Sequence, residues 1–301
     1  MTAAVIDLGT NTFHLIIADL ADNIVNVIYK TDVPARLGEG RLNENIIIPE
    51  AFERGLLTLE AFAKTIQEHK ADIVKATATS AVRSASNGMD FVNAAKERTG
   101  IDIEVISGDR EAEYIFKGVQ ATGMINDTSL VMDIGGGSTE FILCRPDELI
   151  WKKSYDIGAA RLMQAYFKSD PLSLSDKRSI IAHFEHTISD LIAICQIHKP
   201  QTLIGSAGAF ESFATLLMVK EAQDKLSSAP LDVEGYKELA ERLITSTHQE
   251  RVEMEGLIPL RVDMIVIAAV LVNYVMDNTK IENLSLSTFD LKMGVLYSLI
   301  S

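Results

Sequence analysis

Apolar residues follow two different spacings along this sequence. In the segment 49–69 they stand three or four residues apart, which places them on one face of a helix. These positions are Phe52, Leu56, Leu59, Ala63 and Ile66. Pro49 suits the first turn of that helix. Short apolar runs bounded by turn residues, such as 73–77, indicate strands instead.

The two spacings alternate in the same order twice. The first half begins with a pair of strands joined near residues 8–12. After it we expect strands at 24–29, 73–77 and 101–106, and helices at 49–69, 87–98 and 109–117. Asn87 is the expected N-cap of the second of these helices. The second half predicts strands at 129–133, 140–144 and 148–155, helices at 159–167 and 175–197, a strand at 202–204, further helices, a strand at 281–287 and a last helix at 289–300. This order predicts two similar α/β domains with mixed sheets flanked by helices.

An internal repeat supports a duplication. The segment DLGTNTFHLII at 7–17 aligns without gaps with DIGGGSTEFIL at 133–143, and Asp7 matches Asp133. We therefore predict domains at 1–124 and 125–301, with the boundary in the turn-rich stretch 123–128.

Composition limits the partners of the chain. Its 28 Lys and Arg against 42 Asp and Glu give a formal charge of -14, so we expect neither nucleic acid nor an anionic membrane as a partner.

Cys144 and Cys195 lie far apart and are expected to be buried thiols in a reducing compartment. The N-terminus lacks a basic signal-peptide region, and the apolar stretch 264–276 is too short to span a bilayer. We expect a soluble cytoplasmic protein.

Each repeated copy predicts a strand ending in Asp-x-Gly, a turn of small residues and a second strand. Glycine lets the backbone approach an anion, and successive N–H groups in such a turn favour phosphate oxygens. If the two loops face each other across a cleft, Asp7 and Asp133 would meet phosphates through a divalent cation, most simply Mg²⁺. The alternative is an ordinary hairpin turn in which Asp bonds its own backbone. A third loop, GSAGAF at 205–210, opens a helix and is a weaker anion site.

Seven motifs carry a resemblance to a known family. They are DLGTNTFHL at 7–15, RLGEG at 36–40, ATSAVRSASN at 78–87, ISGDREA at 106–112, DIGGGSTE at 133–140, GSAGAF at 205–210 and RVDMI at 261–265. In this order they resemble the Ppx/GppA family of exopolyphosphatases and guanosine pentaphosphate phosphohydrolases, within the actin, Hsp70 and sugar-kinase superfamily. The resemblance implies two duplicated actin-like (ribonuclease H-like) domains with an interdomain cleft. It also makes the C-terminal helix, about 289–301, a candidate to pack on the first domain.

The resemblance further implies Mg²⁺-dependent removal of the terminal phosphate of inorganic polyphosphate by water. Glu111 stands at the second Glu of the family's S-G-x-E-E-A motif and is implied as the base, while Arg110 replaces the first Glu. Asp133 and Glu140 match the family's second acidic pair, implied in catalysis and, with Asp7, in metal binding. Homodimerisation is a family-level expectation.

We expect two kinds of phosphate contact: the small residues of the three loops, and two arginines that match family positions and suit bidentate binding. The candidates are Gly9, Thr10, Asn11, Thr12, Arg83, Arg36, Gly135, Gly136, Gly137, Ser138, Thr139, Gly205, Ser206 and Gly208. Arg261 is equally compatible with a buried ion pair and with a ligand contact.

Three other functions stay open at this point. The substrate could be the 5'-phosphate of guanosine pentaphosphate (pppGpp); the protein could be a small-metabolite kinase of the same superfamily; or it could be a non-catalytic phosphate or nucleotide sensor. Ala209 stands where many family members carry Thr, which argues against an adenosine pocket. Longer relatives continue with a helical domain beyond the position of Ser301, and we expect low processivity without it.

Overall fold

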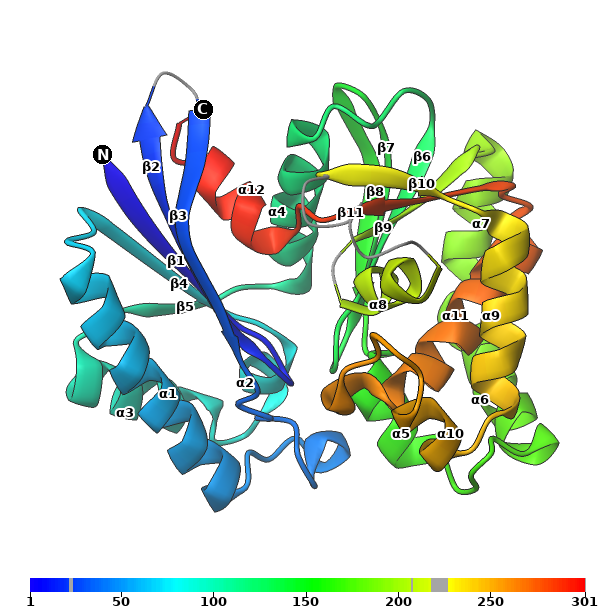
Figure 1. Cartoon of the computed structure of the whole chain (residues 1–301), viewed down its shortest axis with the longest axis horizontal. Coiled ribbons are helices and arrows are strands. Elements are labelled where there is room, and N and C mark those ends of the chain that lie inside the picture. Colours follow the sequence, from blue (N-terminus) through cyan, green and yellow to red (C-terminus); the bar gives the residue numbers. More distant parts are fainter. Residues whose placement is uncertain (22–23, 207, 218–226, 301) are drawn as a thin grey trace.

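A computed structural model of the chain describes residues 1–21, 24–206, 208–217 and 227–300. Two mixed sheets stand side by side, with helices between them and on their outer faces (Figure 1). The first sheet has the order β3-β2-β1-β4-β5. Its strands are β1 (Thr2–Leu8), β2 (Phe13–Ala21), β3 (Ile24–Val33), β4 (Ile73–Ala78) and β5 (Ile103–Val105).

The second sheet has the order β10-β11-β9-β6-β7-β8. Its strands are β6 (Ser129–Ile134), β7 (Thr139–Arg145), β8 (Glu148–Tyr155), β9 (Thr202–Ser206), β10 (Ser228–Leu231) and β11 (Asn283–Ser287). In both sheets three antiparallel strands, β1-β2-β3 and β6-β7-β8, continue into parallel strands through the first of the three. This confirms the expected α/β architecture with two mixed sheets, while the edge strand β10 was not predicted.

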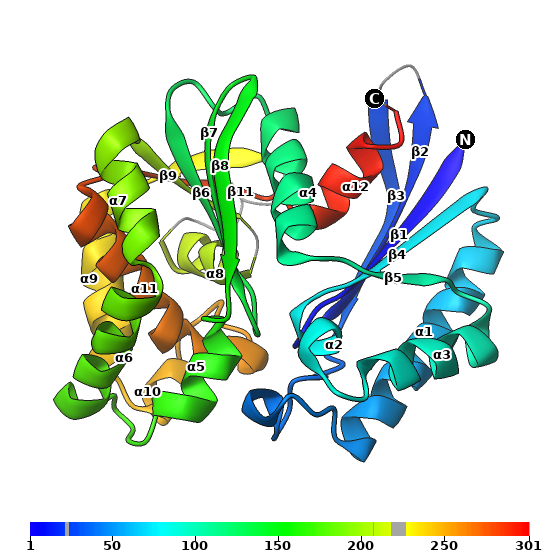
Figure 2. The ribbon, with the colours of Figure 1, turned by 180° about the vertical axis from the view of Figure 1, so that it is seen from behind.

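Helices α1 and α3 cover the outer face of the first sheet, and α6, α7, α9 and α11 gather on the outer side of the second (Figures 1 and 2). The helices are α1 (Pro49–Glu68), α2 (Ser80–Ser84), α3 (Gly88–Thr99), α4 (Gly108–Ala121), α5 (Ala159–Tyr166), α6 (Leu174–Thr187), α7 (Ser189–His198), α8 (Gly208–Leu217), α9 (Val233–Thr245), α10 (His248–Val252), α11 (Met264–Thr279) and α12 (Leu291–Tyr297). Short 3-10 turns lie at Leu42–Glu44 and Pro259–Arg261. As predicted, α11 is largely buried, and so are both cysteines.

Two sequence-based expectations differ from the structure. The helix expected at 175–197 is two helices, α6 and α7, which meet at the buried Ile188. Asn87 precedes α3 but does not cap it with its side chain, because that amide pairs with the backbone N–H and carbonyl of Ile47.

The domain boundary at 124/125 stays a prediction. Within the described residues, no helix combines the length and hydropathy needed to cross a membrane.

Helices α4 and α12 cross between the two sheets and hold both in place. Their apolar residues join those of β1, β2, β6, β7 and β9 in one buried cluster. At the crossing, a Cβ on Gly294 would lie 1.7 Å from the carbonyl oxygen of Tyr114, and one on Gly118 would lie 2.3 Å from that of Asp290. The close approach therefore depends on glycine, and it sets the positions of the side chains that α4 and α12 carry.

Replacing Gly294 tests this crossing. We expect Gly294→Ala to lower the free energy of unfolding by about 1–3 kcal/mol or more, because the new methyl group overlaps backbone that cannot move easily. Urea unfolding measures the loss. Ser298→Ala, just after α12, removes one hydroxyl bond to the carbonyl of Val295 and should cost about 1 kcal/mol at most. Equal stability of Gly294→Ala and the parent would contradict the tight crossing.

Candidate functional site

The two repeated loops adopt the same turn and touch each other. Gly9 N–H donates to the carbonyl of Thr12 at 3.1 Å, and Gly135 N–H donates to that of Ser138 at 3.0 Å. A Cβ on Gly136 would lie 2.5 Å from Asn11 Nδ2 and 3.0 Å from Thr10 Cβ, so the two loops are in close contact at this glycine. The duplication therefore places two equivalent loops face to face.

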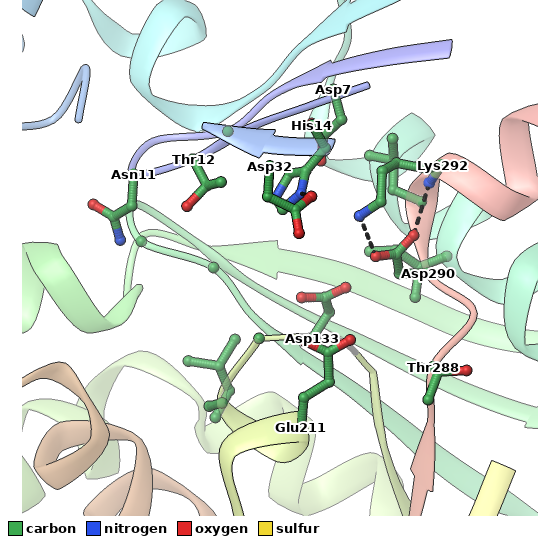
Figure 3. A pocket seen from close by; sticks show the side chains of 18 of the residues that line it. Asp7, Asn11, Thr12, His14, Asp32, Asp133, Glu211, Thr288, Asp290 and Lys292 are labelled. Carbon is green, nitrogen blue, oxygen red and sulfur yellow. Dashed lines mark hydrogen bonds and ion pairs between the residues drawn. The ribbon is translucent and has the colours of Figure 1, made fainter. Parts of the chain in front are cut away.

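The loops border one cavity of about 820 Å³ between the sheets (Figure 3). Most of the residues predicted for the site line it. They are Asp7, Gly9, Thr10, Asn11, Thr12, Glu111, Asp133, Gly135, Gly136, Gly137, Ser138, Glu140 and Gly208. The structure thus brings both loops and all four predicted carboxylates to one space.

The remaining predicted residues do not line the cavity. Thr139 is buried and its hydroxyl donates to the carbonyl of Ile157, and the buried Ser206 hydroxyl donates to that of Phe289. Gly205 lies in β9 and packs against the Phe210 ring, and residue 207 of the same motif lies outside the described residues. Arg36 has an exposed side chain, while its backbone N–H donates to the carbonyl of Asn11. Arg83 does not line the cavity either. Phosphate contacts at these five positions stay predictions.

Asp7 and Asp133 occupy equivalent places near the ends of β1 and β6. Burial raises the pKa of Asp7, and Asp7 Oδ1 is buried without a hydrogen-bond partner in the described part of the chain. Burial also raises the pKa of Asp133 well above its usual value, and the neighbouring Glu140 and Asp290 add to the shift. Burial makes both carboxylates costly to keep ionised, so a cation would stabilise them.

Glu111 projects from the first turn of α4, where the Ser107 hydroxyl caps the helix. Its side chain is buried and accepts a hydrogen bond from Arg83 Nη1 at 2.9 Å. Burial and then the neighbouring Glu140 raise the pKa of Glu111 well above its usual value, while Arg83 opposes the shift. A buried carboxylate with a raised pKa beside phosphate loops suits a general base.

Arg83 therefore opposes the rise in the pKa of Glu111, and its Nη1 also donates to the carbonyl of Ile106. Its predicted contact with phosphate stays a prediction. Arg110, which replaces an expected Glu, bonds Glu113 and the hydroxyl of Tyr114 and does not line the cavity.

Removing the guanidinium should shift the pH dependence of catalysis. Because Arg83 holds the pKa of Glu111 down, Arg83→Gln lets that pKa rise further, and a base works only when deprotonated. We expect the acid limb of kcat/KM to move to higher pH, measured from pH 5 to 9. Arg110→Gln is the matched control and should leave the limb in place. A downward shift in Arg83→Gln would contradict the pairing.

Glu140 lies directly opposite Asp133 in the β6-β7 register. It is 1% exposed and accepts a hydrogen bond from the Ser154 hydroxyl at 2.6 Å. Burial raises its pKa, while the bonds from Ser154 and Ser138 oppose the shift. The hydroxyls hold its carboxylate in one orientation beside Asp133.

Several lining residues were not found by sequence reasoning. Lys292, just inside α12, forms an ion pair with Asp290 and lies near Asp7 (Figure 3). Burial works against its charge, but Asp290 and Asp7 outweigh burial and raise the pKa of Lys292. The sequence feature that could have pointed to Lys292 is the cluster Phe-Asp-Leu-Lys directly after the predicted strand 281–287. No sequence feature pointed to Glu211, which also lines the cavity.

Arg261 forms a partly exposed ion pair rather than a buried one, and its contact with a ligand stays a prediction. It pairs with Glu211 and bonds the Ser212 hydroxyl and the Gly208 carbonyl, and it lines the cavity.

The cavity is acidic. Seven carboxylates line it, from Asp7, Asp32, Glu111, Asp133, Glu140, Glu211 and Asp290. Three permanent cations face them, from Lys30, Arg261 and Lys292. A phosphate chain would meet net repulsion here without added positive charge.

The donor set fits Mg²⁺ shared with a ligand. Mg²⁺ prefers hard oxygen donors and usually takes one or two carboxylates, with water and phosphate oxygens completing its shell. Asp7 and Asp133 supply such carboxylates, and Asp7 Oδ1 lacks a partner in the described residues. Over the same residues, no three Asp, Glu, His or Cys side chains are grouped closely enough to hold a metal alone. Water and phosphate oxygens would complete the shell of a metal held by these carboxylates.

Comparisons with known proteins agree on one family. Residues 16–301 match the model of the Ppx/GppA phosphatase family. The chain is 29% identical over 297 residues to a guanosine-5'-triphosphate,3'-diphosphate pyrophosphatase of Pseudoalteromonas translucida and 29% identical over 301 residues to one of Vibrio vulnificus. Each alignment covers 99% of this chain and 59% of the relative, so the chain spans about three-fifths of the length of these relatives.

Solved structures match over their whole length. An exopolyphosphatase from Cytophaga hutchinsonii is 37% identical, with a TM-score of 0.96 over 100% of this chain and 98% of that one. A PPX-GPPA enzyme of Aquifex aeolicus is 25% identical, with a TM-score of 0.83 over 99% of both chains. With the duplicated loops and the carboxylates between them, these matches establish that the chain belongs to the Ppx/GppA phosphatase family.

Proposed function

We propose that the protein is an exopolyphosphatase, which uses water to release the terminal phosphate of inorganic polyphosphate. One observation carries the proposal: two equivalent phosphate-type loops and the buried base candidate Glu111 border a single cavity. The match to the Cytophaga exopolyphosphatase, whose chain is covered almost entirely, supports this substrate.

In the proposed reaction, Glu111 accepts the proton of the attacking water. Phosphoryl transfer depends mainly on positioning and on stabilising charge. The Gly9 and Gly135 N–H groups close the turns of the two loops. The N–H groups of 10–12 and 136–138 would hold the oxygens of the terminal phosphate, and Lys292 would add positive charge. The oxygen of the attacking water joins the terminal phosphorus, the bond to the bridging oxygen breaks, and a chain shorter by one phosphate leaves.

Mg²⁺ would be held by Asp133 and Asp7, with Glu140 beside them, and would supply positive charge shared by carboxylates and phosphate oxygens. The acidity of the cavity supports this, since three permanent cations face seven carboxylates. Chelation with EDTA should therefore abolish both turnover and tight binding of polyphosphate, and added Mg²⁺ should restore them. Full activity in EDTA would contradict the role of the cation.

Hydrolysis of the 5'-phosphate of pppGpp is the second candidate. The observation that favours it is the similarity to two relatives named as pyrophosphatases of that nucleotide. The two candidates share the same reaction and differ only in the group that carries the terminal phosphates, a longer phosphate chain or a nucleoside.

Rates measured side by side separate them. We expect phosphate release from polyphosphate of about 10 and about 100 residues with a higher kcat/KM than from pppGpp, in the same buffer with Mg²⁺. The reverse order would assign the nucleotide. ATP with candidate sugar acceptors serves as the kinase control, and ADP formation that requires an acceptor would overturn both assignments. Binding of either phosphate compound without turnover would instead indicate a sensor.

A further inference from the structure

The start of α5 holds the loop 135–138 from behind. The carbonyls of 135–137 accept hydrogen bonds from the backbone N–H groups of 158–161, at 2.9–3.3 Å. Glycine at position 158 permits this approach, because a Cβ on Gly158 would lie 2.5 Å from the carbonyl of Gly136. The Arg161 side chain adds a bond from Nε to the carbonyl of residue 137 at 2.9 Å. All three carbonyls therefore face α5.

This support fixes the direction of the loop's N–H groups. The peptide bonds of the loop are trans, and in a trans peptide the carbonyl of one residue and the N–H of the next point in opposite directions. The N–H groups of 136–138 therefore point away from α5. None of the three donates to a protein atom in the described part of the chain, and all three residues line the cavity. They are left as donors for an anion.

The first loop has a support of the same kind. The carbonyls of Thr10 and Asn11 accept hydrogen bonds from two backbone N–H groups of the segment 36–38, at 3.0 and 2.8 Å. The N–H groups of 11 and 12 therefore point away from that segment, and they too have no protein acceptor among the described residues. Two separate segments thus orient the two loops.

Arg161 joins these two supports. Its Nη1 donates to the carbonyl of Leu42 at 3.3 Å, and its own carbonyl accepts a bond from Asn43 Nδ2 at 3.0 Å. About one turn further along α5, Gln164 Nε2 donates to the carbonyl of Gly38 at 2.9 Å. Figure 2 shows α5 beside this part of the first half of the chain. One guanidinium thus contacts the second loop and the segment that supports the first.

Neither substrate contact nor stability accounts for Arg161. Its side chain does not line the cavity. Its Nη2 is buried without a hydrogen-bond partner among the described residues, and an unsatisfied buried donor costs free energy. Proteins keep such costs mainly where function requires the arrangement.

We propose that Arg161 is a positioning residue for phosphate binding. It holds the loop 135–138 in the orientation that presents its N–H groups to the cavity, and it fixes this loop relative to the loop 9–12. The inference rests on the proposed function. It also gives the motif at 36–40 a task that needs only its backbone, which agrees with the exposed side chain of Arg36.

Binding of tripolyphosphate, a short linear phosphoanhydride, tests the proposal. Calorimetry with Mg²⁺ present uses Glu111→Gln as the reference protein, so that hydrolysis does not interfere. Adding Arg161→Gln should weaken binding about tenfold or more, as expected when charge-assisted hydrogen bonds are lost. Adding Arg161→Lys should weaken it to a similar extent, because lysine keeps the charge but lacks the planar fork that reaches both carbonyls. Arg145→Gln is the control, since Arg145 pairs with Glu148 at the surface and does not line the cavity.

Amide resonances show whether the loop is the part that changes. In the ¹⁵N-labelled reference protein, the amide protons of 136–138 should shift when tripolyphosphate binds. At saturating tripolyphosphate the shift should be smaller in Arg161→Gln. A purely structural role would lower the melting temperature and leave both the affinity of the folded protein and these shifts unchanged.

The outcomes separate the alternatives. Unchanged affinity in Arg161→Gln would overturn the proposal, and so would reference affinity in Arg161→Lys, which would assign the effect to charge alone. Amides of 136–138 that do not respond in a reference protein that binds would overturn it as well. Failure of the Glu111→Gln reference to bind tripolyphosphate would refute the proposed function first, and the inference with it.

A milder variant serves if the Arg161 variants do not fold. Gln164→Ala removes only the side-chain bond to the carbonyl of Gly38. We expect it to weaken tripolyphosphate binding about threefold or more, the effect of one neutral hydrogen bond. Unchanged affinity in Gln164→Ala would then overturn the proposal.

Discussion

Replacing Glu111 by glutamine should reduce phosphate release from polyphosphate about 10²–10⁴-fold, the range supplied by a positioned general base. The amide keeps the shape of the side chain and its contact with Arg83, but it does not accept a proton from water. Binding should persist or tighten, because the change removes one negative charge from an acidic cavity. A fall in kcat with little change in KM, measured by phosphate release at saturating Mg²⁺, is the expected result.

Glu113→Gln is the matched control for this change. Glu113 lies two residues further along α4, pairs with Arg110 and Lys152, and does not line the cavity. Its replacement should leave kcat within about twofold of the parent, since a surface ion pair contributes little. Turnover of Glu111→Gln at the rate of the parent would remove Glu111 from the reaction.

Replacing Asp133 by asparagine should make the protein more stable and far less active. Folding raises the pKa of Asp133 above its usual value, so at neutral pH the ionised form opposes folding, and a neutral side chain of the same shape removes that cost. We expect the free energy of unfolding to rise by on the order of 1–3 kcal/mol in the absence of Mg²⁺. Activity should fall at least about 10²-fold, because a carboxylate proposed to hold the cation is lost.

Two measurements check this prediction: thermal unfolding without divalent cations, and the Mg²⁺ concentration needed for half-maximal activity. Asp147→Asn, at an exposed position between β7 and β8, should change neither. The stability gain should also shrink as the pH falls through the raised pKa of Asp133, because the parent then becomes neutral as well. A loss of stability in Asp133→Asn would contradict the destabilising effect assigned to this buried charge.

Much of the site could be predicted from local sequence, because the repeat encodes a local structure. Strand, Asp-x-Gly, turn and strand follow one another within residues 2–21 and 129–145, and backbone geometry alone then places Asp7 and Asp133 at equivalent points. Glu111 was reached through the family motif, and the structure explains its placement by the capped first turn of α4.

Residues that depend on distant packing could not be predicted in the same way. Lys292 reaches the cavity because α12 crosses α4 at Gly118 and Gly294, and the sequence does not encode that crossing as a local pattern. The contact of His14 with Asp32, 18 residues away on β3, likewise depends on the register of the folded sheet. The two helices within 175–197 share one apolar pattern, so spacing alone did not reveal the break at Ile188.

The central claim is that water removes single phosphates from the end of a linear phosphate chain at the cavity between the sheets. Following polyphosphate of one defined length by ³¹P NMR, with Mg²⁺ and parallel samples of the parent and Glu111→Gln, tests it most directly. We expect inorganic phosphate to rise one-for-one with chains shorter by one residue in the parent, and both products to form at least about 10²-fold more slowly in Glu111→Gln. Cleavage at internal positions, or equal phosphate release by both proteins, would contradict the claim.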